Sequence, residues 1–349
     1  MKNNNLEQFD PNAPGRKGKL FGLPHTREQS ELIIIPIPWE VTVTAGTGTA
    51  DAPSALLEAS CEVDLFSKEI IDVWKLGIML LDLPEEIQKE NEKVRALATQ
   101  HIRALEKGEA SDTKVITTKV NEASENLNIY VKNTAQKLLQ EGKMVGLLGG
   151  DHSTPLGFIR ALSERYERFG ILQIDAHADL RRSYEGFIYS HASIMYNVLK
   201  LPAVSRLVQV GIRDYCEEEF TVMQRAMGRV KTFFDADMKE ALYSNKTWDI
   251  ICKEIIRELP DLVYISFDID GLTPDHCPHT GTPVPGGLDF NQVKFLLKQL
   301  AISGKKIIGF DLCEVSGKNE WDATVGSRVL FELCNWMAVS NKKLELRTS

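Results

Sequence analysis

The chain has 349 residues, with 41 lysines and arginines against 49 aspartates and glutamates, a net charge of −8 and 43% hydrophobic residues. Such a globular composition suits one large α/β domain or two smaller ones. The acidic balance argues against nucleic acid as a partner, because no basic stretch is present to neutralise phosphates. No apolar run approaches the ~18 residues of a bilayer-spanning helix, and the N-terminus lacks the apolar core of a signal peptide. Six scattered cysteines without a CxxC pair indicate reduced thiols, so we expect a cytoplasmic protein without a membrane partner.

Two parts are expected in chain order, an N-terminal extension at 1–30 and a single domain at 31–349. The first is polar, with proline and glycine, and we expect it to drape over the surface. The domain opens with an apolar strand at 32–38, followed by a loop rich in glycine and threonine at 43–50. That loop lacks the Lys-Ser/Thr of a P-loop and a GxGxxG pattern, so we do not interpret it as a phosphate cradle. A helix follows, with Pro53 in its first turn.

A strand at 77–83 and two long charged helices at 85–107 and 118–141 come next. Beyond residue 143 strands alternate with helices, a pattern typical of parallel strands joined by crossover helices. The further strands are expected at 143–148, 171–174, 207–211, 231–234, 262–268 and 306–312, and helices near 154–166, 190–199, 216–227, 246–258, 289–303 and 323–338. With about eight strands, no internal repeat and no linker, the sequence predicts one three-layer α/β domain with a doubly wound, mostly parallel sheet.

Three short clusters of imidazoles and carboxylates each follow or interrupt a predicted strand. In open α/β sheets the ligand crevice lies beyond the carboxyl ends of the strands, so these clusters should meet at one sheet edge. Four carboxylates offset the charge of two divalent cations, and imidazole favours transition metals over Mg or Ca. The sequence therefore predicts a two-metal site formed by six residues, namely His152, Asp175, His177, Asp179, Asp268 and Asp270.

The spacing within the clusters restricts their geometry. Asp268 and Asp270, two apart on a strand, face the same way about 6.6 Å apart and can serve adjacent ions. Asp175 and Asp179 would lie roughly 13 Å apart if extended, so the strand must end near Asp175 and the chain must curl back. A bridging aspartate, either Asp175 or Asp268, would hold two ions about 3.5–4 Å apart and favour hydrolysis by an activated water. Few basic residues stand in these loops, which argues against phosphate esters as substrates.

Three motifs, Gly149-Gly-Asp-His-Ser153, Asp175-Ala-His-Ala-Asp179 and Ser266-Phe-Asp-Ile-Asp-Gly271, resemble the signatures of the ureohydrolases, the family of arginases, agmatinases and formiminoglutamases. The similarity spans roughly 32–338 and is closest to the agmatinase-like branch. It implies an arginase-like fold, a homo-oligomer (trimer or hexamer) and two Mn²⁺ ions, with Ni²⁺ possible in members that hydrolyse guanidine. One metal would be held by His152, Asp175, Asp179 and Asp268, and the other by Asp175, His177, Asp268 and Asp270.

The resemblance also implies the reaction and the residues that perform it. A metal-bridging hydroxide would attack the guanidino carbon of a small guanidino compound, agmatine-like or guanidine itself, and urea would leave. The catalytic residues implied are His191, Glu314 and Asp179. His191 falls where the family places a mobile histidine that transfers protons, a role that suits its ordinary pKa. Glu314 falls where members hydrogen-bond the guanidinium, and a carboxylate can pair with that planar group through two bonds.

The sequence restricts the part of the substrate beyond its guanidino group less closely than it restricts the reaction. Agmatinase-like chains usually carry an acid where Arg182 stands, so either Arg182 points to solvent or the substrate is neutral, anionic or tail-less. Trp321, next to Asp322, resembles a feature of a subgroup linked to free guanidine and could stack on a small planar cation. Thr273 departs from the usual acid of the third motif, and His276 and His279 nearby are not expected to be ligands.

The sequence leaves three hypotheses on the function open. The first is an agmatinase-like amidinohydrolase, with substrate contacts from Glu314, Arg182 and Trp321. The second lies in the same class: a formiminoglutamase, whose anionic substrate would pair with an arginine and release formamide, or an arginase. The third is a non-catalytic or deacetylase-like metal protein on a related fold, against which the complete ligand set argues.

Overall fold

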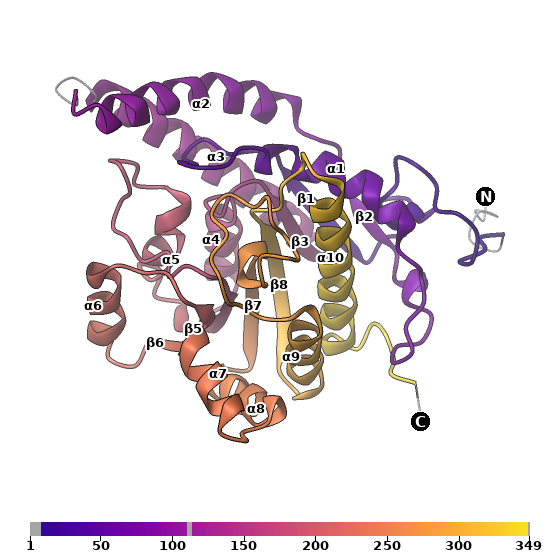
Figure 1. The fold of residues 1–349 in the computed structure, drawn as a ribbon. Coiled ribbons are helices and arrows are strands. Elements are labelled where there is room, and N and C mark those ends of the chain that lie inside the picture. The colour runs from indigo at the N-terminus through magenta and orange to yellow at the C-terminus, as the bar shows by residue number, and fades with distance from the viewer. Residues whose placement is uncertain (1–7, 110–113, 348–349) are drawn as a thin grey trace.

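The computed structural model describes residues 8–109 and 114–347 (Figure 1). Within them eight strands form one sheet, and every pair of neighbouring strands is parallel. The order across the sheet is β2-β1-β3-β8-β7-β4-β5-β6. The strands are β1 (Leu32–Ile37), β2 (Ile78–Leu80), β3 (Met144–Gly149), β4 (Phe169–Ile174), β5 (Val204–Ile212), β6 (Val230–Phe234), β7 (Leu262–Asp268) and β8 (Lys306–Cys313).

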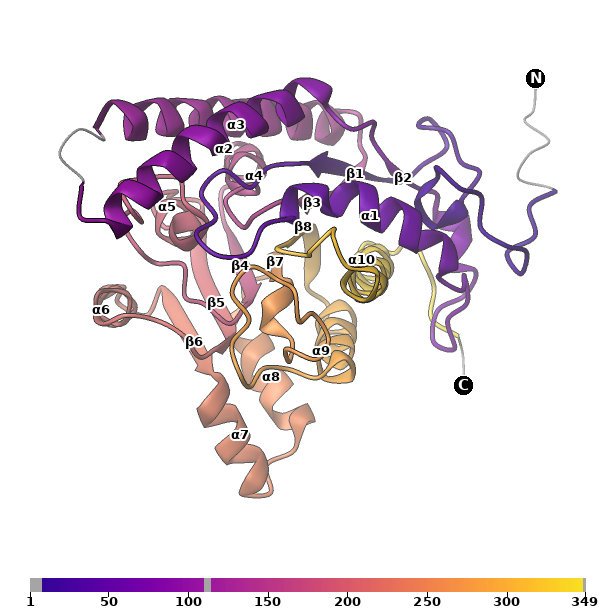
Figure 2. The same ribbon diagram turned by 45° about the horizontal axis from the view of Figure 1, so that its top comes forward.

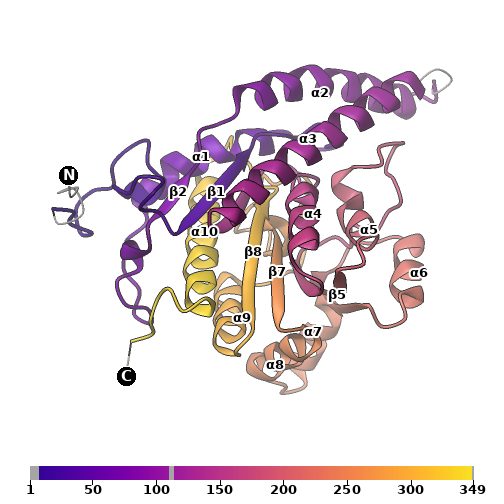
Figure 3. The ribbon, with the colours of Figure 1, turned by 180° about the vertical axis from the view of Figure 1, so that it is seen from behind.

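Helices cover both faces of the sheet, which makes three layers (Figures 1 and 2). The helices are α1 (Ala52–Ala59), α2 (Glu85–Glu106), α3 (Lys114–Gln140), α4 (Leu156–Arg165), α5 (Ile194–Val198), α6 (Glu217–Arg225), α7 (Asp235–Tyr243), α8 (Trp248–Glu258), α9 (Phe290–Ile302) and α10 (Glu320–Ser340). Seen from behind, α3 and α4 cover one face and α2 lies against α3 (Figure 3), while α1, α8, α9 and α10 pack on the other face.

Alternation along the strands divides the apolar residues between two cores. On β1, Leu32 and Ile34 point into the core under α1 and α10, whereas Ile33 and Ile35 point into the core under α3 and α4. All six residues of β1 are buried, as expected for a strand covered on both faces. The single doubly wound α/β domain predicted from the sequence is therefore confirmed.

The elements differ from the prediction in three places. The strand expected at 77–83 pairs only over Ile78–Leu80, at the sheet edge beside β1. The helix expected at 190–199 is a 3-10 turn at His191–Ser193 followed by the short α5. Helix α7 was not predicted, because it starts directly after β6 and buries only Asp235 and Met238, too few positions to show a helical apolar period.

Part of the N-terminal region lies in the core instead of on the surface. Leu20, Phe21 and Leu23 are all buried, and the ring of Phe21 packs edge-on against Phe331 of α10 at 5.1 Å between centroids. The expected surface location is therefore wrong for these residues. Their apolar run is short, and the polar residues around it made the whole segment resemble a surface extension. Residues 1–7 lie outside the described ranges.

The carboxyl ends of four adjacent strands at the centre of the sheet carry all the predicted site clusters. His152 follows β3, Asp175 follows β4, Asp268 ends β7 and Glu314 follows β8. Since β3, β8, β7 and β4 are neighbours in that order, the clusters meet at one edge, as predicted. Among the described residues, no helix is long and apolar enough to cross a membrane.

Candidate metal centre

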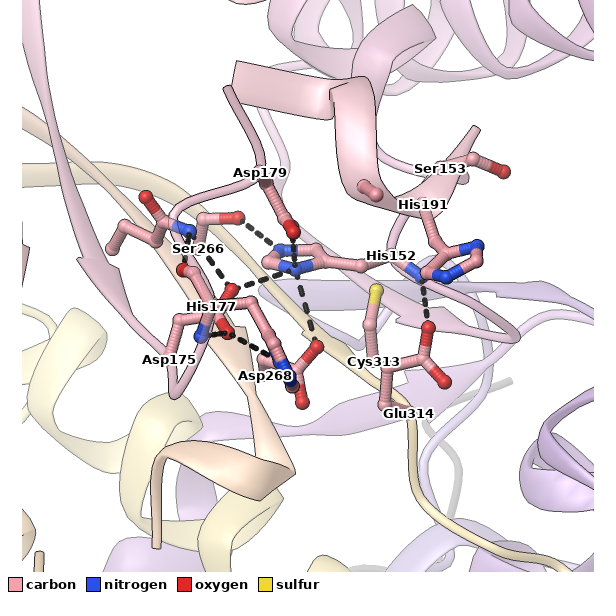
Figure 4. Close-up of polar contacts among 12 residues, drawn as sticks. His152, Ser153, Asp175, His177, Asp179, His191, Ser266, Asp268, Cys313 and Glu314 are labelled. Atoms are coloured by element: carbon pink, nitrogen blue, oxygen red, sulfur yellow. Dashed lines mark hydrogen bonds and ion pairs between the residues drawn. The ribbon is translucent and has the colours of Figure 1, made fainter. Parts of the chain in front are cut away.

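His152 lies at the middle of the site, on a tight turn after β3. Gly150 permits this turn, since a Cβ there would lie 2.1 Å from the carbonyl oxygen of Trp39 in the loop after β1. The imidazole of His152 is buried, and its Nδ1 faces three carboxylates (Figure 4). The distances from Nδ1 are 3.0 Å to Asp175 Oδ2, 3.1 Å to Asp179 Oδ2 and 3.2 Å to Asp268 Oδ2.

The opposite nitrogen of His152 shows that this ring suits a metal. Its Nε2 lies 2.9 Å from the hydroxyl of Ser266, and that hydroxyl donates in turn to Asp311 Oδ1 at 3.2 Å. Because the hydroxyl proton goes to Asp311, Ser266 accepts the Nε2 proton, and Nδ1 would direct its lone pair toward the carboxylates once it has lost its own proton. Metal-binding histidines are commonly oriented in this way through their second nitrogen. Nδ1 itself is buried without a hydrogen bond to any described residue.

A second ligand group lies beside the first and shares Asp175 with it. His177 Nδ1 is 2.9 Å from Asp270 Oδ2 and 3.7 Å from Asp175 Oδ1. Donor atoms of His152, Asp175 and Asp179 all lie within 4.8 Å of one another, and so do those of Asp175, His177 and Asp270. A carboxylate with one oxygen toward each group has the geometry of a bridging ligand. Of the two bridging candidates, Asp175 is the better supported, because Asp268 faces His152 through Oδ2 while its Oδ1 accepts the backbone N–H of Asp270 at 2.9 Å.

The carboxylate of Asp175 is held by groups behind it. Gln173 Nε2 donates to its Oδ2 at 2.8 Å, and the backbone N–H of His177 donates to its Oδ1 at 2.7 Å. Gln209 on β5 fixes the amide of Gln173 by donating to its Oε1 at 2.7 Å. Beyond Asp175 the chain curls back, as its spacing required, and Asp179 takes a left-handed backbone conformation with φ of 54°.

Four clustered carboxylates and two imidazoles determine one another's protonation in the metal-free protein. Burial alone would lower the pKa of His177, but Asp270 and its neighbouring carboxylates outweigh this and raise that pKa to about 11. Burial would raise the pKa of Asp270, but the adjacent His177 lowers it to about 2. Burial and the charge of Asp175 raise the pKa of Asp179 to about 7. Protonation of these groups would therefore compete with metal binding.

Metal affinity should rise with pH for this reason. Protonated imidazoles at His152 and His177 must lose their protons before they can ligate, so lower pH favours the proton over the metal. For each proton released, the apparent affinity should change about tenfold per pH unit. Calorimetric titrations with Mn²⁺ between pH 6.5 and 8.5, in buffers of different ionisation enthalpy, measure both affinity and proton release. An affinity independent of pH across that range would contradict this protonation scheme.

His191 and Glu314 complete the site. Both line the same cavity of about 150 Å³ as His152, His177, Asp179, Asp268 and Asp270. Burial and the positive charges of His177 and His152 lower the pKa of His191 to about 3, so its imidazole is neutral near pH 7 and does not keep the ordinary pKa expected from the sequence. Glu314 has a left-handed backbone, with φ of 62°, and its Oε1 accepts the backbone N–H of His152 at 2.9 Å. Burial and the nearby Asp151 raise the pKa of Glu314 well above its usual range.

Several residues that line the cavity were not predicted from the sequence to belong to the site. Arg181 lines the cavity, with its guanidinium over the ring of Tyr184 at 4.9 Å and its Nε 3.8 Å from Glu219 Oε2. Asp214 lies at the end of a predicted strand, so the strand-end rule could have identified it. No sequence pattern around Glu219 indicates a place in the cavity. The cavity is further lined by Thr44, Ala192, Tyr215 and Thr282.

Two predicted substrate contacts are not brought to the cavity. The side chain of Arg182 is 68% exposed and pairs with Glu218 at 3.1 Å, so it points to solvent as one of the two alternatives required. Trp321 is half exposed, and its indole N–H donates to the carbonyl of Asp275 at 3.0 Å. His276 and His279 also lie outside the cavity lining, where their ring nitrogens contact Thr273 and Asp322.

Comparisons with known proteins agree with this geometry. The family model described as the arginase family matches residues 30–335. An N(1)-aminopropylagmatine ureohydrolase of Thermus thermophilus is 31% identical over 85% of this chain and 86% of its own. An agmatinase of Bacillus anthracis is 28% identical over 86% of this chain and 88% of its own. The crystal structure of the agmatine ureohydrolase of Thermoplasma volcanium superposes with a TM-score of 0.72 at 24% identity, covering 97% of this chain and 98% of that one.

The arginase family uses a binuclear metal centre, and the residues of the two groups that could hold metal ions belong to the three motifs. The family model and the relatives cover most of the chain, from β1 to α10. The resemblance drawn from the motifs is thereby confirmed. The chain belongs to the arginase family and is a hydrolase of that family.

Proposed function

We propose that the protein is a binuclear-metal amidinohydrolase that releases urea from a small guanidino compound. One observation carries this proposal: His191 and Glu314 line the same cavity, of about 150 Å³, as members of both candidate ligand groups. A cavity of that size suits guanidinium or a compact guanidino compound. The names of the relatives, agmatinase and N(1)-aminopropylagmatine ureohydrolase, support the same reaction class.

The metals proposed are two Mn²⁺ ions, with Ni²⁺ as the alternative. His152, Asp175, Asp179 and Asp268 would hold one, and Asp175, His177, Asp268 and Asp270 the other. When bound, such a pair lowers the pKa of a water molecule toward neutrality and so supplies the nucleophile. Mixed imidazole and carboxylate ligation favours first-row transition metals over Mg or Ca.

Glu314 is the residue proposed to bind the guanidinium group. Its carboxylate is buried, and no arginine, lysine or histidine forms an ion pair with it among the described residues. A buried carboxylate without a cation is unstable, which is why its pKa is raised. A guanidinium would supply the missing positive charge together with two parallel N–H donors. Binding at this position would direct the planar carbon toward the ligand groups.

His191 is proposed to accept a proton at Nε2 from the attacking water and to pass it to the leaving amine. The imidazole is neutral near pH 7 and lies on the cavity wall. Its Nδ1 is 3.3 Å from the hydroxyl of Thr42, whereas its Nε2 has no hydrogen-bond partner within the ranges that the structure describes. The free nitrogen is therefore available to substrate.

The function is tested by urea release from a panel of compounds. The protein, loaded with Mn²⁺ or Ni²⁺, would be assayed with agmatine, arginine, guanidinobutyrate and guanidine, and for formamide with formiminoglutamate. We expect urea from at least one guanidino compound and no formamide. Formamide from formiminoglutamate would favour the alternative assignment as a formiminoglutamase, and turnover of arginine alone would favour an arginase. Absence of both products with every compound and either metal would refute the proposed hydrolase.

Arg181 should oppose substrates with a cationic tail. It is the arginine among the residues that line the cavity, and a second positive charge beside it is unfavourable. Arg181→Ala should therefore raise kcat/KM for agmatine relative to guanidinobutyrate, by about tenfold for a screened pair at a half-exposed position. Arg182→Ala, at the exposed neighbour, is the matched control and should leave the ratio unchanged. An unchanged ratio in the Arg181 variant would remove this role.

The assembly and location predicted from the sequence stay predictions. A homo-oligomer is supported by exposed apolar side chains on α3, where Val115, Ile129 and Tyr130 are 62%, 47% and 37% exposed. Light scattering coupled to gel filtration measures the number of subunits directly.

A further inference from the structure

The loop between β1 and α1 reaches the catalytic histidine. Thr42 on this loop is buried, at 1% exposure, and its hydroxyl accepts the backbone N–H of His191 at 3.2 Å. The same hydroxyl lies 3.3 Å from His191 Nδ1. One side chain thus contacts both the backbone and the ring of His191, although the two residues are 149 positions apart in the sequence.

We propose that Thr42 positions His191 and thereby makes the loop at 38–48 a part of the active site. The inference rests on the proposed function, since it assumes that His191 transfers a proton to the leaving group. Thr42 does not line the cavity, so it would act only through the histidine. With Nδ1 occupied by the hydroxyl, the ring presents Nε2 to the cavity in one orientation.

His191 needs such an anchor because its own element holds it weakly. It begins a three-residue 3-10 turn, and the hydroxyl of Ser190 accepts from Ala192 N at 3.3 Å to cap that turn. The ring contacts Tyr184 edge-on, with 6.2 Å between centroids, and its Nδ1 also lies 3.4 Å from the hydroxyl of its neighbour Ser190. Short 3-10 turns do not fix a side chain by themselves. Thr42 therefore makes the shorter of the two hydroxyl contacts to Nδ1, and the one that comes from another part of the fold.

Thr42 is itself held rigidly from two sides. Arg95 of α2 donates through Nη1 to the carbonyl of Val41, at 3.0 Å, and to that of Val43, so it binds the backbone on both sides of Thr42. On the other side the Thr42 hydroxyl lies 3.5 Å from Asp151 Oδ2. Asp151 Oδ1 accepts the backbone N–H of Ser153 at 3.0 Å and also its hydroxyl, which fixes that carboxylate. The threonine is thus a rigid link between α2, the first metal-binding turn and His191.

Glu40 fixes the remainder of the loop. Its Oε2 accepts the backbone N–H groups of Gly48 at 2.6 Å and Ala50 at 3.2 Å, and its own N–H donates to Asn91 of α2 at 2.8 Å. The loop is therefore closed on itself and attached to α2. The loop is rich in threonine and glycine, and these hydrogen bonds within the loop account for that composition without a bound phosphate.

The test compares Thr42→Val, which removes the hydroxyl at nearly constant shape, with Thr42→Ser, which keeps it. Thr47→Val is the matched control, since Thr47 is exposed on the same loop and lies outside the cavity lining. With the metal-loaded enzyme, Thr42→Val should lower kcat about 10–100-fold with KM within about threefold, part of the contribution of a positioned acid–base group. Thr42→Ser and Thr47→Val should stay within about threefold of the wild type.

A double-mutant cycle separates positioning from a general structural effect. If Thr42 acts through His191, Thr42→Val should cause no further loss of kcat when added to His191→Asn. Losses that multiply, or a Thr42→Ser variant as impaired as the valine, would overturn the inference. His191→Asn with full kcat would instead refute proton transfer by His191.

An additional readout does not need turnover. In zinc-loaded protein with ¹⁵N-labelled histidine, the ring signals of His191 should shift in Thr42→Val and stay unchanged in Thr47→Val. Unchanged signals in Thr42→Val would contradict the contact even if no guanidino compound were hydrolysed.

Discussion

An Asp175→Asn variant is expected to lose both metal ions and with them the activity. Asp175 is the residue shared by the two ligand groups, and an amide cannot bridge two cations as a carboxylate does. Metal analysis of the dialysed protein should fall from about two ions per chain to about zero, and urea release should fall by at least about 10⁴-fold. The wild type should also gain about 2.7 kcal/mol of stability at a metal concentration 100 times Kd, a gain that the variant should lack.

Glu218→Gln is the matched control for Asp175→Asn. It also removes one carboxylate, but from an exposed residue that pairs with Arg182 away from the cavity. Its metal content and activity should equal those of the wild type. Circular dichroism of the metal-free Asp175 variant checks that the chain folds. Retention of two ions per chain by a folded Asp175→Asn protein would refute the bridging role.

Glu314→Gln should abolish recognition of the guanidinium group while leaving the metals in place. The glutamine can still accept the N–H of His152, but it has no negative charge for the substrate. Removing one charge of a buried, hydrogen-bonded pair costs about 3–4 kcal/mol, which corresponds to a loss of ~10²–10³-fold in kcat/KM. Guanidinium chloride should inhibit the wild type competitively and should inhibit the variant far less.

A control variant and a metal measurement accompany the Glu314→Gln experiment. Glu320→Gln changes the same residue type at the exposed start of α10 and should have no effect. Metal content measured beside the kinetics separates lost substrate contact from lost cofactor. A Glu314→Gln enzyme with the kcat/KM of the wild type would show that the guanidinium binds elsewhere.

The sequence predicted the sheet well because most strands are apolar runs followed directly by a turn or a polar cluster, although β5 and β6 also contain charged and polar residues. Six ligand candidates could be grouped because parallel strands deliver their carboxyl ends to the same edge, and the structure places His152, Asp175 and Asp268 within 3.2 Å contacts there. The positions of His191 and Glu314 came from family resemblance, since neither has a local pattern of its own.

The remainder of the site could not be predicted because it depends on contacts between distant segments. Thr42 meets His191 across 149 residues, and nothing in the spacing of either motif indicates that approach. Arg181 and Arg182 are adjacent in the sequence, yet the side chain of Arg181 lines the cavity and that of Arg182 points to solvent. The sequence does not indicate which of the two arginines faces the cavity. Helix α7 was missed because its burial is too slight to produce a period.

The strand order has a consequence for the assembly of the active site during folding. β8 is the last strand in the sequence, yet it lies between β3 and β7 in the middle of the sheet. The bond from His152 N–H to Glu314 closes a separation of 162 residues. Such long-range closure is slow, and a growing chain on the ribosome cannot complete the sheet until β8 has emerged. The site is thus among the last features to form, and a nascent chain should acquire metal affinity only near the end of its synthesis.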